Sequence, residues 1–139
     1  MDRPIVEEKL ESLRHCVLRL QAKCPSTAVL LAENEDLQDI VAMNLARAVQ
    51  LCVDIAAHIV AESDLPAPNT MAESFELLQR LGVLGRETAD KMKKAVGFRN
   101  IAVHSYEKID WEIVYSVCRH RLADFSEFAH SIAGTLDKG

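Results

Sequence analysis

Apolar residues recur every three or four positions along almost the whole chain, and this spacing constrains the fold more than any other feature of the sequence. The period is that of an α-helix whose apolar stripe faces a core. Only five glycines and four prolines are available for turns. The sequence therefore predicts an all-α fold. The clearest stripe, in residues 35–62, consists of Leu37, Ile40, Val41, Asn44, Ala48, Leu51, Cys52, Ile55 and Ile59, with Asn44 as a polar interruption.

Start and stop signals divide the chain into about five helices. Pro4 suits the first turn of a helix, and Pro25 ends that helix. Asn34 and Asp110 are N-cap residues, and Thr70 opens a Thr-x-x-Glu capping box. We expect a bundle without strands, with a loop over residues 64–69. The predicted helices cover residues 4–24, a short turn at 26–31, and then 35–62, 70–81, 86–97 and 110–132.

Length and composition indicate one globular domain spanning residues 1–139. Hydrophobic residues make up 49% of the chain and charged residues 27%, which is far from the composition of a disordered protein. No apolar leader follows the N-terminus, and no stretch approaches about 18 uninterrupted apolar residues. We therefore expect a cytoplasmic protein with neither a signal peptide nor a membrane span.

The four cysteines, Cys16, Cys24, Cys52 and Cys118, are widely spaced and form no Cys-x-x-Cys pair. Each lies in or beside an apolar stretch, where a free cysteine behaves as a small buried hydrophobe. We expect reduced thiols and no disulfide, zinc site, other metal or cofactor.

Charge is unevenly distributed along the chain. The formal net charge is −5, which argues against a protein that coats nucleic acid by bulk electrostatics. Residues 86–108, however, hold six basic and three acidic side chains, a local balance of +3. Because charge can be segregated on a folded surface, a small basic site remains compatible with the negative net charge of the whole chain.

That basic segment contains the most polar cluster of the chain. Residues 97–106 read Gly-Phe-Arg-Asn-Ile-Ala-Val-His-Ser-Tyr and gather Arg99, Asn100, His104 and Tyr106 within eight positions. We place this segment between the last two predicted helices. The arrangement matches an Arg-x4-His-x-Tyr motif, and through it the chain resembles the HepT-type toxins of the HEPN superfamily.

The resemblance extends beyond the motif, to residues 44–58 and to residues 75–84. It implies a metal-independent endoribonuclease that is the toxin of a type II (HEPN/MNT) toxin–antitoxin system. RNA is the implied substrate, and the implied active form is a homodimer whose two motifs face one cleft. The implied partner is a nucleotidyltransferase antitoxin that attaches AMP groups to Tyr106. Ser105 departs from the family pattern, which usually has an acidic residue there.

The residue types suit this chemistry. RNA cleavage without a metal needs proton transfer at the 2′-hydroxyl and at the leaving 5′-oxygen, and positive charge near the phosphate. His104 is the candidate for proton transfer because its charge changes near neutral pH. Arg99 is the candidate phosphate ligand because its planar fork can bind two oxygens. Asn100 is expected to position the substrate or to hold the Arg99 and His104 rotamers.

Helix geometry restricts how these side chains can meet. Arg99 and His104 are five positions apart, which is about 140° around a regular helix. One uninterrupted helix therefore cannot aim Arg99, His104 and Tyr106 at one phosphate. Either the helix ends between Val103 and Ser105, or a second chain completes the site.

Simpler interpretations of each residue are available. His104 could be a buried histidine bonded to a backbone carbonyl, and Arg99 a surface ion-pair partner of Asp90 or Glu107. Tyr106 could be a core ring with a solvated hydroxyl. For the whole chain, the alternatives are a non-catalytic helical binding partner of a nucleotidyltransferase and a structural dimerising adaptor.

Overall fold

A computed structural model describes residues 2–138 and confirms the all-α prediction, with no strand in that range. Most helices begin and end where the local signals predict. The elements are α1 (Arg3–Lys23), α2 (Ala28–Glu33), α3 (Glu35–Ala61), α4 (Met71–Arg80), α5 (Arg86–His104), the 3-10 helix η1 (Tyr106–Lys108), α6 (Trp111–His120) and α7 (Ala123–Lys138).

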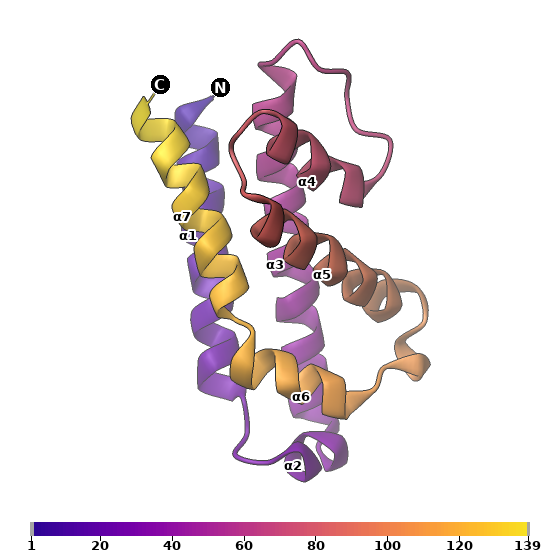
Figure 1. The fold of residues 1–139 in the computed structure, drawn as a ribbon. Helices are drawn as coiled ribbons and strands as arrows, with labels where there is room; N and C mark the ends of the chain where they lie inside the picture. The colour runs from indigo at the N-terminus through magenta and orange to yellow at the C-terminus, as the bar shows by residue number, and fades with distance from the viewer. Residues whose placement is uncertain (1, 139) are drawn as a thin grey trace.

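The long helix α3 occupies the centre of the bundle (Figure 1). Helix α1 packs along one side of it, and α4 and α5 pack along the other. Helix α7 lies beside α1 and also contacts α5, while α2 and α6 pack together at one end of the bundle. The two ends of the described chain meet, because Arg3 Nη1 donates to the Leu136 carbonyl oxygen at 3.1 Å.

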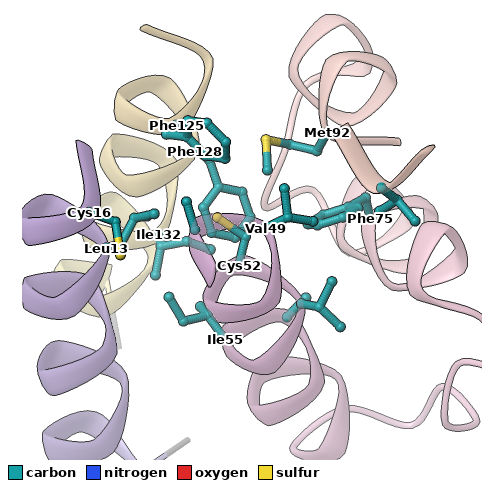
Figure 2. Close-up of a cluster of buried hydrophobic side chains, with 14 of the residues drawn as sticks. Leu13, Cys16, Val49, Cys52, Ile55, Phe75, Met92, Phe125, Phe128 and Ile132 are labelled. Carbon is teal, nitrogen blue, oxygen red and sulfur yellow. The ribbon is translucent and has the colours of Figure 1, made fainter. Parts of the chain in front are cut away.

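The core lies where α3 faces α1, α4, α5 and α7 (Figure 2). Two aromatic rings from distant parts of the chain, Phe75 and Phe128, meet edge to face with their centroids 5.8 Å apart. Both are fully buried, and Met92 and Cys52 are buried in the same core. Burial of each phenylalanine stabilises the fold by roughly 1.5–3 kcal/mol, and their contact joins α4 to α7 across the core.

Helix α3 begins as predicted, because the Asn34 side chain accepts the Leu37 N–H at 3.0 Å. Asn44, the polar interruption in its stripe, is buried and donates from Nδ2 to the Ile40 carbonyl oxygen at 2.8 Å. Within residues 2–138, α3 alone has the length and mean hydropathy, 1.5, of a possible membrane span. A core helix passes the same test, and 56% of this apolar window is buried in the bundle.

Two other helices begin after a threonine whose hydroxyl caps the helix. The Thr70 hydroxyl accepts the Glu73 N–H at 3.1 Å, as the capping box predicts. The short helix starts two positions later than predicted, at Ala28, because Thr27 caps it through the Leu30 N–H.

The prediction that a helix ends near Gly97 was wrong. Helix α5 continues through this residue to His104, so Arg99, Asn100 and His104 lie on a helix, and only Tyr106 of the motif follows its end. Glycine costs a helix about 1 kcal/mol relative to alanine. Val96, which is buried, and Phe98, which is half-buried, pack against the core on either side of Gly97 and hold the helix together.

The last predicted helix, residues 110–132, is divided into α6 and α7, so the described chain has seven α-helices where about five were predicted. The break lies at Arg121, whose φ of −121° and ψ of 4° are not helical. The two parts pack on different neighbours, α6 on α2 and α7 on α1 and α5. A straight helix could not bury the apolar residues of both parts.

Candidate active site

The motif lies where α5 gives way to the 3-10 helix η1. Ser105 adopts φ −146° and ψ 50°, and its N–H donates to the Ile101 carbonyl oxygen at 2.9 Å. The helix therefore ends at His104, inside the interval of residues 103–105 that was the first of the two alternatives predicted from helix geometry. As a result, the chain changes direction before Tyr106, and Tyr106 lies outside the helix that carries Arg99 and His104.

Arg99 and Asn100 are neighbours on the last turns of α5 and touch each other. Arg99 is half-buried and Asn100 is exposed. The Arg99 Nη1 atom donates to the Asn100 Oδ1 atom at 3.4 Å, a long and therefore weak hydrogen bond. Arg99 pairs with neither Asp90 nor Glu107, so its guanidinium remains available for an added anion.

His104 is the last residue of α5 and is exposed. Within the described part of the chain, its imidazole makes no hydrogen bond to a carbonyl or to a carboxylate. The interpretation of His104 as a buried structural histidine is therefore wrong.

Tyr106 is held at both ends of its side chain. The hydroxyl donates to Asp39 Oδ1 on α3 at 2.6 Å, and the ring lies edge-on to Trp111 with centroids 5.8 Å apart. Tyr106 remains 39% exposed, so it is neither a core ring nor a residue with a solvated hydroxyl only. Burial, the hydrogen bond to Asp39, and the charges of Asp39 and Glu35 raise the pKa of Tyr106 to about 12.

Asp39 was not identified from the sequence. It lies 67 positions before Tyr106 on the exposed side of α3, among other acidic residues that suit a helix N-terminus. No spacing rule connects the two segments. Trp111, at the start of α6, is half-buried and also contacts the Tyr106 ring.

The structure brings the motif residues together in two separate groups. Arg99 contacts Asn100, and Tyr106 contacts Asp39 and Trp111. No hydrogen bond joins Arg99 to His104 within residues 2–138. On one regular helix the two residues are about 140° apart in direction and about 7.5 Å apart along the axis.

The positive charge near the motif is smaller than the count of basic residues suggests. Arg86, Lys91 and Lys93 form ion pairs with acidic neighbours. Lys94, Arg99 and Lys108 form none in the part of the chain that the structure covers. The cations without an acidic partner thus include the motif arginine.

A groove of about 530 Å³ lies next to the motif, between α5, α6 and the start of α7. Its walls are mainly apolar and include Phe98, Ile101 and Ile113, and Lys94 and Lys108 are also among its lining residues. Ile101 is 42% exposed and Ile113 is 60% exposed. Arg99 and His104 do not line this groove.

No group of three or more histidine, cysteine, aspartate or glutamate side chains is arranged to hold a metal ion within residues 2–138. The four cysteines are free. Burial raises the pKa of Cys52 well above the usual value and that of Cys118 to about 12. Since the thiolate is the reactive form, these two thiols are unreactive.

Comparison with known proteins places this helical bundle among toxins of the HEPN class. The mRNA nuclease HepT of Shewanella oneidensis is 36% identical over 124 residues, which are 89% of this chain and 92% of that protein. A structure of the tri-AMPylated HEPN toxin of Shewanella oneidensis with its MNT antitoxin is 35% identical. It has a TM-score of 0.87 and covers 94% of this chain and 97% of that chain.

A crystal structure of a toxin–antitoxin with AMP-PNP has a TM-score of 0.88 at 34% identity, covering 94% of this chain and 98% of that chain. The family model that matches, over residues 8–132, is that of HepT-like ribonucleases. This chain belongs to the ribonuclease HepT-like family.

Proposed function

We propose that this chain is the toxin of a bacterial toxin–antitoxin pair and acts in the cytoplasm as a metal-independent endoribonuclease. The observation that carries the proposal is that the side chains of Arg99 and His104 are available to an added ligand. Both belong to the motif, and neither has a carboxylate or backbone partner within residues 2–138 that would give it a structural task. A guanidinium and an imidazole available to an added phosphodiester are what this reaction needs.

In the proposed mechanism, His104 acts in proton transfer. A base takes the proton of the ribose 2′-hydroxyl as its oxygen bonds the neighbouring phosphorus. The bond from phosphorus to the 5′-oxygen breaks, and an acid returns a proton to that oxygen. The products are a 2′,3′-cyclic phosphate and a free 5′-hydroxyl. Arg99 binds the phosphate oxygens as their charge rises, and Asn100 holds the guanidinium.

We propose that the active form is a homodimer, because one chain does not bring these groups together. Arg99 and His104 are five positions apart on a regular helix, so their side chains point in different directions. A partner related by a two-fold axis would supply a second Arg99/His104 pair across a shared cleft. The apolar groove with Ile101 and Ile113 lies next to the motif on α5. Its exposed apolar side chains suit an interface between two copies.

The proposed partner is a nucleotidyltransferase antitoxin that transfers AMP to Tyr106. Support comes from the related Shewanella oneidensis toxin, which is tri-AMPylated in complex with an MNT antitoxin. The Tyr106 ring is partly exposed two positions after His104. AMP on its hydroxyl would bring phosphate charge beside the cleft that RNA must enter.

The test is to express the chain alone, with and without His104→Ala, and to follow growth and RNA integrity. The proposal predicts that only the wild type stops growth and degrades RNA. Cleavage by the purified protein should persist in EDTA and leave 2′,3′-cyclic phosphate ends. Cleavage that EDTA abolishes would identify a different enzyme. Binding to a nucleotidyltransferase without cleavage would identify the non-catalytic partner instead, and dimerisation alone the structural adaptor.

A further inference from the structure

Asp39 directs its carboxylate at the one tyrosine hydroxyl of the motif. The contact joins α3 to η1, and its oxygen–oxygen distance of 2.6 Å is typical of a hydrogen bond to a charged acceptor. An ionised carboxylate only accepts hydrogen bonds, so the phenol is the donor. The Trp111 ring, edge-on at 5.8 Å, restricts the other end of the same side chain. The hydroxyl is therefore fixed with its proton directed at a base.

No other task in the described chain accounts for Asp39. The residue that caps α3 is Asn34, and the acidic residues of the first turn are Glu35 and Asp36. Asp39 comes later in the helix and forms no ion pair with a basic side chain within residues 2–138. Tyr106 is its only side-chain hydrogen-bond partner in that range.

We propose that Asp39 is a catalytic residue for nucleotidyl transfer onto Tyr106, in which it orients the hydroxyl and accepts its proton. The inference rests on the proposed function, in which a nucleotidyltransferase partner modifies this tyrosine. It adds that the toxin itself supplies the general base for its own silencing.

The reaction balances without a further reagent. The Tyr106 oxygen bonds the α-phosphorus of a nucleoside triphosphate, the bond from that phosphorus to the β-bridging oxygen breaks, and pyrophosphate leaves. The phenolic proton moves to Asp39 Oδ1. A carboxylate is a much weaker base than a phenolate, so the proton moves late, as the new bond to phosphorus makes the phenol acidic. The catalytic-loop aspartate of protein kinases accepts a hydroxyl proton in the same way.

The surroundings of the hydroxyl support a need for such a base. Tyr106 is protonated at neutral pH, as an ordinary tyrosine is, and burial together with the carboxylates of Asp39 and Glu35 raises its pKa further, to about 12. The same carboxylates repel a bare triphosphate, so the nucleotide must arrive with its charge neutralised by a divalent cation on the partner. The surroundings of the Tyr106 hydroxyl are therefore acidic, whereas the end of α5, where RNA phosphate would bind, is cationic.

Asp39→Asn separates catalysis from a merely structural hydrogen bond. The amide oxygen of asparagine still accepts a hydrogen bond from the phenol, but it takes up no proton. The experiment combines the purified full chain, its cognate nucleotidyltransferase, ATP and magnesium ions. The rate of AMP attachment is followed by intact mass and by pyrophosphate release.

We expect Asp39→Asn to lower kcat for AMP attachment by about 100-fold or more, with little change in KM for ATP. Asp39→Glu retains a carboxylate and should be at least about tenfold faster than Asp39→Asn. The matched control is Asp36→Asn, one turn earlier on the same helix and also exposed, which should react like the wild type. Circular dichroism verifies that each variant is folded.

Wild-type rates in Asp39→Asn would overturn the proposal and leave the proposed function intact. Equal, slow rates in Asp39→Asn and Asp39→Glu would also overturn the role as a base, since only position would then matter. A wild-type chain that is neutralised without any AMP on Tyr106 would overturn both this inference and the covalent route of the proposed function.

Discussion

Tyr106 and Asp39, 67 positions apart in the chain, are joined by a hydrogen bond of 2.6 Å between the phenolic oxygen and carboxylate Oδ1. The bond ties the turn that follows the motif helix to the central helix α3. It orients the hydroxyl that we expect a partner to modify, and it adds to the effect of burial in raising the pKa of that hydroxyl.

The raised pKa of Tyr106 predicts how the stability of the fold depends on pH. Its folded-state value of about 12 lies above the usual 10. As pH rises, the unfolded chain therefore loses this proton before the folded chain does. The corresponding stabilisation is complete below about pH 10 and is lost between about pH 10 and pH 12. Ultraviolet titration of tyrosinate in the wild type and in Tyr106→Phe isolates this group from Tyr115, and ionisation near pH 10 in the folded chain would contradict the assignment.

Arg99→Ala and His104→Ala should each lower RNA cleavage by about 100-fold or more, because each removes a group that acts on the reacting phosphate. Neither residue belongs to the core, so the free energy of unfolding should change by about 1 kcal/mol or less. His130→Ala removes another exposed histidine and serves as the control. Folded alanine variants that cleave at the wild-type rate would refute the assigned roles.

Tyr106→Phe should preserve RNA cleavage but escape covalent silencing, because it lacks only the oxygen that accepts AMP. Tyr115→Phe is the matched control, since the Tyr115 hydroxyl donates to the Ser26 carbonyl oxygen at 2.9 Å, away from the motif. Mass spectrometry of the toxin co-expressed with its antitoxin provides the measurement. An unmodified Tyr106 in a fully neutralised complex would favour steric capping by the bound antitoxin.

Ile113→Asp should convert the proposed dimer into a monomer and abolish cleavage, because it introduces a charge into the apolar groove beside the motif. Val29→Asp alters a side chain that is similarly exposed, at 61% against 60% for Ile113, but lies on α2 outside the groove. Sedimentation at micromolar concentration distinguishes the two states. A stable wild-type monomer at that concentration would rule out the dimer.

Phe75→Ala should reduce the free energy of unfolding by about 3–5 kcal/mol, because it leaves a cavity beside the fully buried Phe128 ring. Leu81→Ala, in the residue just after the same helix, alters a side chain that is already 36% exposed and should cost much less. Urea unfolding measures both changes. Similar losses in the two variants would show that the Phe75–Phe128 contact does not hold α4 onto the bundle.

The sequence by itself determined the helical class and most helix boundaries, because these depend on interactions between residues a few positions apart. Asn34 and Thr70 cap their helices through an N–H three positions later, and Asp110 caps α6 through an N–H two positions later. The motif residues were also identified from sequence, since the spacing of Arg99 and His104 is a property of the chain alone.

Tertiary packing decided what local signals could not. Gly97 weakens a helix locally, but α5 continues through it because Val96 and Phe98 gain contact with the core. The break at Arg121 exists because α6 and α7 pack against different helices. Asp39 became part of the candidate site only when α3 and η1 came together, because a hydrogen bond across 67 positions follows from the path of the whole chain and leaves no periodic signal in the sequence.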